Sequence, residues 1–163
     1  MFVCSVRAST IKFFALVLSV ALLGFVLISM GAENAVYVSA EGVSINYTGI
    51  KDNEDRLGFI RSFGLEVEKN PIEEESFIMP KNFDRVILGY NQLQLSQGLD
   101  LEKYTRRRVT HYAYRVTNYD YDGEVVVNLL IHKGRIIGTD ISSTQKDGFI
   151  LPLTEIDQDK IKR

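Results

Sequence analysis

Arginines are the residues of this chain whose type and spacing best suit a binding chemistry. A run of three at positions 106 to 108 is followed by Arg115, Lys133 and Arg135, with tyrosines interleaved. Guanidinium groups bind phosphate and carboxylate oxygens, and tyrosine rings add stacking surface. We therefore expect a partner-binding basic face made of Arg107, Arg115 and Arg135. The alternative is an ordinary strand surface that balances nearby acids.

Histidine and cysteine are too sparse to indicate a metal centre. His111 and His132 fall on neighbouring predicted strands, where diagonal residues lie about 7–8 Å apart. A zinc site normally takes three or four ligands, and the sequence has no HExxH motif or paired Cys/His spacing. The segment Asp120–Glu124 matches a calcium loop only in part, and a hairpin turn accounts for its Asp122-Gly123 pair. We expect no metal and no cofactor.

Catalytic signatures are also missing from the sequence. Asp140 lies near Ser142 and Ser143, but there is no GxSxG or SxxK motif to activate a serine. A second arrangement would place Asp100, Glu102 and Asp140 around an acid-rich cleft of an enzyme whose site is assembled from dispersed residues. We expect a non-catalytic protein, with that enzyme as the alternative, and assign no catalytic residue.

An uncharged apolar run from Phe13 to Met30 predicts where the chain resides. Its length nearly spans the roughly 30 Å hydrocarbon core of a bilayer as a helix. Arg7 and Lys12 precede it and Glu33 follows, which predicts the N-terminus in the cytoplasm and the C-terminal domain outside. The expected partner of residues 13–32 is thus the lipid bilayer. The alternative is a signal peptide cleaved after Ala40, which would give a secreted domain.

Composition bounds the remaining chain to one mildly acidic domain. The 163 residues carry 21 acidic and 19 basic side chains. Two of the basic ones, Arg7 and Lys12, precede residue 33, so the chain from residue 33 onward has a net charge of −4. A negative net charge excludes non-specific attraction to nucleic acid. Cys4 is the single cysteine, so disulfides cannot stabilise the domain. We expect a cytoplasmic N-terminus (1–12), a transmembrane signal-anchor (13–32), a spacer (33–51), an extracytoplasmic domain (52–153) and a flexible charged tail (154–163).

Periodicity predicts two helices and several strands in this domain. Asn53 is an expected N-cap, followed by Leu57, Ile60 and Phe63 on one helix face, and a second helix is expected over 82–97. A further helical turn is expected over 101–104, and strands are expected over 65–69, 74–79, 107–118, 124–132, 135–141 and 148–151. Short hairpin links favour an α+β fold with an antiparallel sheet and both helices on one face.

The Asp122-Gly123 pair sets an expected register for the central hairpin. A turn at these two residues would place Tyr114 opposite Ile131 and Val116 opposite Leu129. One face of the hairpin would then be continuously apolar, as a buried sheet face requires.

Several segments together resemble a family of small, membrane-anchored proteins, largely from Gram-positive anaerobic bacteria, that is defined by a domain of unknown function. The similarity spans about 56–151 and rests on GLEV (64–67), IMP (78–80), YNQLQ (90–94), GLDL (98–101), YAYRVTNY (112–119), VNLL (127–130) and RIIGTDI (135–141). The resemblance implies a cell-envelope location and this topology, and it implies no activity.

These observations lead to one functional hypothesis. We expect a membrane-anchored extracytoplasmic domain that acts as a non-catalytic binding or regulatory module of the cell envelope. Its partner would be an envelope protein or an anionic polymer, bound at the basic face or by strand addition to a sheet edge. A secreted, inhibitor-like module after signal cleavage is the further alternative.

Overall fold

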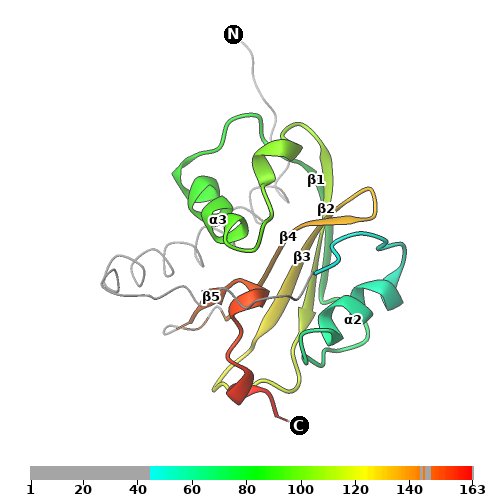
Figure 1. The fold of residues 1–163 in the computed structure, drawn as a ribbon, viewed down its shortest axis with the longest axis vertical. Helices are drawn as coiled ribbons and strands as arrows, with labels where there is room; N and C mark the ends of the chain where they lie inside the picture. The colour runs from blue at the N-terminus through cyan, green and yellow to red at the C-terminus, as the bar shows by residue number, and fades with distance from the viewer. Residues whose placement is uncertain (1–44, 144, 146–147, 163) are drawn as a thin grey trace.

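The computed structural model describes residues 45–143, 145 and 148–162. Within them, five antiparallel strands form one sheet in the order β1-β2-β3-β4-β5, accompanied by two α-helices (Figure 1). The elements are α2 (Asn53–Arg61), β1 (Glu73–Ile78), α3 (Arg85–Leu95), η1 (Leu101–Tyr104), β2 (Arg108–Arg115), β3 (Val126–His132), β4 (Arg135–Ser142), β5 (Ile150–Leu151), η2 (Leu153–Glu155) and η3 (Gln158–Lys160). The predicted α+β class and antiparallel sheet are confirmed.

Acidic caps set where both helices begin. Asp52, one residue before the expected cap, accepts a hydrogen bond from the Asp55 amide, and the Asp55 side chain accepts one from the Asp52 amide. This reciprocal pair satisfies donors that a helix leaves free in its first turn. Asp84 caps α3 by accepting from the amides of Val86 and Ile87.

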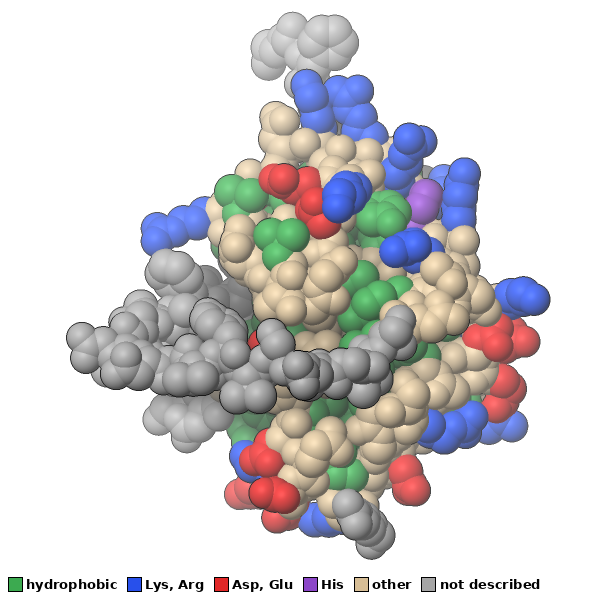
Figure 2. Space-filling view, in the orientation of Figure 1, with side chains coloured by type: hydrophobic (Ala, Val, Ile, Leu, Met, Phe, Trp, Pro, Cys, Tyr) green, Lys and Arg blue, Asp and Glu red, His purple; other side chains and the backbone are tan. Residues whose placement is uncertain are grey.

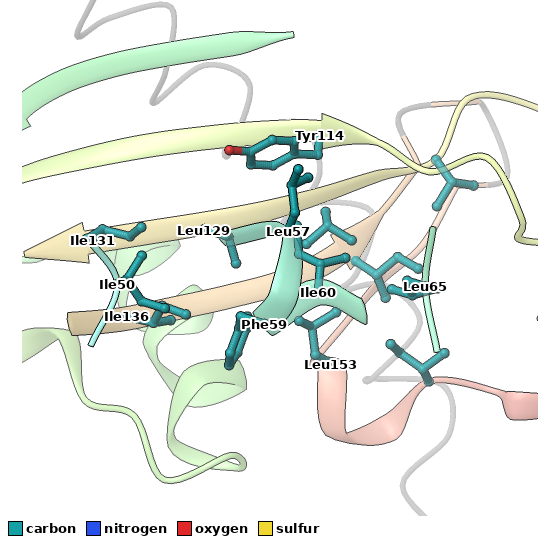
Figure 3. Close-up of a cluster of buried hydrophobic side chains, with 14 of the residues drawn as sticks. Ile50, Leu57, Phe59, Ile60, Leu65, Tyr114, Leu129, Ile131, Ile136 and Leu153 are labelled. Atoms are coloured by element: carbon teal, nitrogen blue, oxygen red, sulfur yellow. The ribbon is translucent and has the colours of Figure 1, made fainter. Parts of the chain in front are cut away.

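The two helices cover opposite faces of the sheet, which corrects the expectation that they share one face. On the α2 face, Leu57 and Ile60 join Leu129 of β3 in one buried cluster (Figure 3). On the α3 face, Tyr90 joins Leu130 of β3 in a second cluster. Successive strand residues point to opposite faces, so the buried pair Leu129-Leu130 requires cover on both sides.

The hairpin of β2 and β3 has a different register from the one expected. Thr110 pairs with Ile131 and Tyr114 with Val127, a shift of four residues that keeps every side chain on its predicted face. The chain leaves the hairpin after the Val116 amide donates to the Val125 carbonyl. It then pairs elsewhere: Val116 bridges to Val67 and Tyr119 bridges to Ile161. These distant partners determine the path of the loop between β2 and β3, and no two-residue turn at Asp122-Gly123 joins the strands directly.

The packed unit extends past both expected boundaries of the 52–153 domain. In the expected spacer, Ile50 is buried and Thr48 bridges to Arg135 at the start of β4. In the expected flexible tail, Ile156 is 7% exposed and Ile161 packs against the same cluster as α2. The tail is therefore structured through Lys162, because its apolar residues fill the core beside α2. Residues 1–12, 13–32 and 33–44 lie outside the described part.

Candidate functional site

The structure separates the three arginines of the expected basic face. Arg115, at the end of β2, forms ion pairs with Glu68 at 3.0 Å and Glu124 at 2.8 Å. The hydrogen bonds that Arg115 donates to these two carboxylates raise its pKa and occupy its guanidinium. Arg107 precedes β2, so about 26 Å of strand lies between it and Arg115. Arg107 and Arg135 remain at one end of the sheet, and Arg115 belongs to the other.

The end of the sheet that holds Arg107 and Arg135 carries seven cationic side chains from four parts of the chain. None of the described residues forms a salt bridge with any of these side chains. Figure 2 shows Lys and Arg side chains crowded around a histidine at this end, while Asp and Glu side chains lie mainly lower on the molecule. We call the group the basic end: Lys51, Arg56, Arg106, Arg107, Arg108, Lys133 and Arg135.

Part of the basic end surrounds a hollow on the α2 face of the sheet. Its volume is about 360 Å³, and its cationic residues are Lys51, Arg56, Arg108 and Lys133. The other residues that line it are Tyr112, Ile50, Thr110, Ile131, His132 and Gly134. No acidic residue lines this basic hollow among the described residues. Four positive charges in one concavity create a strongly positive local potential.

Backbone contacts between distant segments build the rim of the hollow. The Ile50 amide donates to the Gly134 carbonyl at 3.0 Å, which ties Lys51 to the turn between β3 and β4. Lys133 and Gly134 in this turn have φ values of +46° and +73°, as two-residue hairpin turns with the native strand twist require. A Cβ at Gly134 would lie 3.1 Å from the Ile50 carbonyl oxygen, so glycine permits the close approach.

Arg56 is fixed before any ligand arrives. Its guanidinium carbon lies 3.9 Å from the ring centre of Tyr112, and its Nε donates to the Tyr114 hydroxyl at 2.6 Å. The Tyr114 hydroxyl in turn donates to Asn53 Oδ1 at 2.8 Å, and Arg56 Nη2 donates to the same oxygen at 3.3 Å. Stacking and hydrogen bonding therefore orient the guanidinium plane, and Nη1 has no hydrogen-bond partner among the described residues.

The tyrosines beneath Arg56 stay protonated and neutral. Burial raises the pKa of Tyr114, and the hydrogen bond and charge of Arg56 oppose that shift. Burial also raises the pKa of Tyr112; the Arg56 charge lowers it and Glu74 on β1 raises it. Neither phenol contributes negative charge to the hollow at neutral pH, and Glu74 is the neighbouring acid on the β1 side.

A second group of polar residues lies under α3, on the opposite face. Tyr90 donates to Asp140 Oδ2 at 2.7 Å, and Asn128 Nδ2 donates to Asp140 Oδ1 at 2.8 Å. His111 Nε2 donates to Asn128 Oδ1 at 2.9 Å, and Asn128 also donates to the Ser142 hydroxyl at 3.1 Å. The fold thus joins Asp140 to a histidine that sequence spacing did not link to it.

The hydrogen-bonded group around Asp140 is buried, so its role is to support the fold. Asp140, His111 and Ser142 are each 2% exposed, so a substrate has no path to them. Burial raises the pKa of Asp140, while the hydrogen bonds from Tyr90 and Asn128, the His111 charge and Ser142 oppose that shift. Asp100 is engaged separately: it caps η1 and pairs with Lys103 at 3.5 Å. Asp100 and Asp140 are therefore held by different partners, and Glu102 is exposed.

The histidines do not form a metal site with each other. His132 Nδ1 donates to the Arg108 carbonyl at 2.7 Å, and its ring meets that of Tyr104 edge-on. His111 is bound to Asn128 on the buried side of α3. Within the described ranges no three His, Cys, Asp or Glu residues are grouped to hold a metal ion.

Sequence reasoning missed two members of the hollow, Lys51 and Arg56. Lys51 fell in the expected spacer, and Arg56 reads as an ordinary exposed residue of an amphipathic helix. Their role arises when α2 packs over β2, a contact between residues 58 positions apart. The positive charge of the 106–108 run was the available signal, since Arg108 lines the hollow.

Comparison of the chain with protein-family models, with curated proteins and with solved structures found no match. The resemblance to a family of membrane-anchored proteins thus stays a prediction. None of the helices in the described residues is long and apolar enough to span a membrane, and the 13–32 segment lies outside them.

Proposed function

We propose that this chain is a non-catalytic binding module of the bacterial cell envelope that holds an anionic polymer at its basic end. One observation carries the proposal: seven cations from four parts of the chain share one end of the sheet without any salt bridge to a described residue. Arg115 at the other end of the sheet, by contrast, is balanced by Glu68 and Glu124. Unbalanced cations in an acidic domain favour an anionic partner.

The same proposal covers location. Residues 13–32 would anchor the chain in the cytoplasmic membrane, and the folded domain would face outward, where wall polymers rich in phosphate lie. The intact mass of the protein in the membrane fraction, combined with protease treatment of whole cells, tests this. A full-length mass with the domain removed by protease supports the anchor. A mass beginning near Glu41, with protein in the medium, supports the secreted alternative.

Binding is tested with the full-length chain in detergent micelles and a soluble poly(glycerol phosphate) as the probe. We expect affinity to fall steeply as salt rises from 50 to 300 mM, because exposed charges are screened within a Debye length of about 10 Å at 0.1 M. Replacement of Arg106, Arg107 and Arg135 by Gln should weaken binding about tenfold or more.

A matched triple variant separates local charge from net charge. Arg61, Lys69 and Lys160 are exposed and lie outside the basic end, so their replacement by Gln removes the same three charges elsewhere. We expect this control to bind within about twofold of the native chain. Equal losses from both triples would overturn a specific role for the basic end.

A further inference from the structure

The basic hollow differs from the rest of the basic end in shape. Arg106, Arg107 and Arg135 are exposed, whereas Arg56 is half-buried and lines a concavity of about 360 Å³. A concave site contacts a small group from several sides, while a convex cluster attracts an extended chain without fixing it. The hollow is therefore suited to a defined chemical group.

Resting on the proposed function, we propose that the basic hollow is a phosphate-binding subsite for the terminal phosphorylated polyol unit of the anionic polymer. Arg56 is its anchor. The guanidinium plane lies against Tyr112, Nε is bound to Tyr114, and no described residue accepts a hydrogen bond from Nη1. An oriented guanidinium binds two oxygens of a phosphate in parallel, and little side-chain entropy is lost because its conformation is already fixed.

The charges on the rim favour phosphate over carboxylate. Lys51, Arg108 and Lys133 join Arg56 around the hollow, and no acidic residue lines it among the described residues. A phosphate monoester at the end of the polymer carries up to two negative charges and three free oxygens for these donors, whereas a carboxylate carries one charge and two oxygens. Glu74 repels an anion on the β1 side, so the phosphate is expected between Arg56 and Lys133.

The apolar lining of the hollow accommodates the carbon part of the ligand. Ile50 and Ile131 are buried and line the hollow together with Tyr112. This apolar patch suits the short carbon chain of a polyol attached to the phosphate. The volume of about 360 Å³ exceeds that of a bare phosphate ion and leaves room for such a group.

The experiment uses the full-length chain in detergent micelles with glycerol 3-phosphate as the probe, measured by isothermal titration calorimetry. Arg56→Lys keeps the charge but loses the planar fork and its stacking on Tyr112, so affinity should fall about tenfold. Arg61→Lys, a conservative change of an exposed α2 residue outside the basic end, should bind within about twofold. Glycerate, which replaces the phosphate by a carboxylate, should bind about tenfold more weakly than glycerol 3-phosphate.

A second variant guards against a folding defect in Arg56→Lys, which also loses a hydrogen bond to Tyr114. Lys133→Gln changes an exposed turn residue that no described side chain pairs with, and it should weaken glycerol 3-phosphate binding about threefold or more. Native affinity in both variants, or equal affinity for glycerate, would overturn the subsite. The proposed function fails separately, if the Arg106, Arg107 and Arg135 triple variant still binds the polymer as the native chain does.

Discussion

At the residue scale, Asp140 is a buried carboxyl group whose hydrogen bonds only partly replace its lost hydration. The carboxyl group accepts hydrogen bonds from Tyr90 and Asn128 while being almost fully removed from water. Its raised pKa shows that the loss of hydration outweighs these donors. Tyr90 responds in the same direction: burial and the neighbouring carboxylate raise its pKa well above the ordinary value. The arrangement fixes α3 on the sheet at an energetic cost that varies with pH.

The raised pKa gives a pH dependence of stability with a defined sign. In the unfolded chain the Asp140 carboxyl titrates near its ordinary value of about 3.9, and in the folded chain it titrates above this value. The unfolded state therefore binds fewer protons in that interval, and the stabilisation is lost as pH rises through the folded pKa. The free energy of unfolding of the native chain minus that of Asp140→Asn should thus fall as pH rises from about 3.5 to 7.

Urea unfolding of the full chain in mild detergent, followed by tyrosine circular dichroism at several pH values, measures this difference. Asp140→Asn is the reference because it cannot ionise, and all other titrating groups are shared by the two proteins. Parallel pH curves for the two proteins would contradict the assignment.

At the element scale, side chains of the α3 segment and the segment around Thr48 cover part of the β4 edge of the sheet. Beyond its short pairing with β5, the edge of β4 is covered by two glutamine side chains of the α3 segment. Gln94 Oε1 accepts a hydrogen bond from the Thr139 amide at 2.8 Å, and Gln97 Nε2 donates one to the Thr139 carbonyl at 2.6 Å. A side-chain amide carries the same donor and acceptor as a peptide group, so α3 acts here as a substitute strand. The segment around Thr48 covers the first residues of β4.

Two glycine substitutions should change stability in opposite directions. Gly134→Ala places a Cβ 3.1 Å from the Ile50 carbonyl at a φ of +73°, so it should destabilise the protein by about 1 kcal/mol or more. Gly89→Ala lies on the exposed face of α3 with nothing within 4 Å of the new Cβ, so it should stabilise by about 0.5–1 kcal/mol. Denaturant unfolding measures both; a destabilised Gly89→Ala would show that α3 contacts another surface there.

At the scale of the whole molecule, one asparagine joins three distant segments. Asn118 accepts the Glu66 amide at 2.8 Å and donates to the Gly64 carbonyl at 3.0 Å and, at 3.4 Å, to the Lys162 carbonyl. It thereby ties the loop after α2, the β2–β3 connection and the C-terminal segment into one unit. Charge also differs along the molecule, with the basic end at one end of the strands and the Arg115 ion pairs with Glu68 and Glu124 at the other.

Loss of this junction should destabilise the whole domain. Asn118→Ala leaves partly buried backbone groups without partners, which should cost about 1–3 kcal/mol. Asn46→Ala is the control, because Asn46 is exposed and bonds only its neighbour Thr48 among the described residues; its effect should stay within about 0.5 kcal/mol. The two variants are compared by their urea midpoints, and a cost confined to Asn46→Ala would contradict the role of Asn118.

The sequence alone determined the order and kind of most elements. Alternation in 107–118 and 124–132 and the apolar face of the first helix act between near neighbours, so they can be recognised without a fold. The same local pattern indicated β1, η1 and β4 at nearly their observed bounds. The strand expected over 65–69 forms only the bridge of Val67 to Val116. The length of a short strand depends on how many residues of a neighbouring strand pair with it, and the sequence pattern alone does not give that number.

Only the tertiary structure decided the helix faces, the β2–β3 register and the basic hollow. Each depends on contacts between residues far apart in sequence, such as Arg56 with Tyr114 or Asn118 with Gly64. Hydrophobic periodicity shows that a face is buried, but it does not say which element covers it. The sequence predicted a basic face of Arg107, Arg115 and Arg135, whereas the packing of α2 over β2 brings Arg56 to the hollow at one end of the sheet.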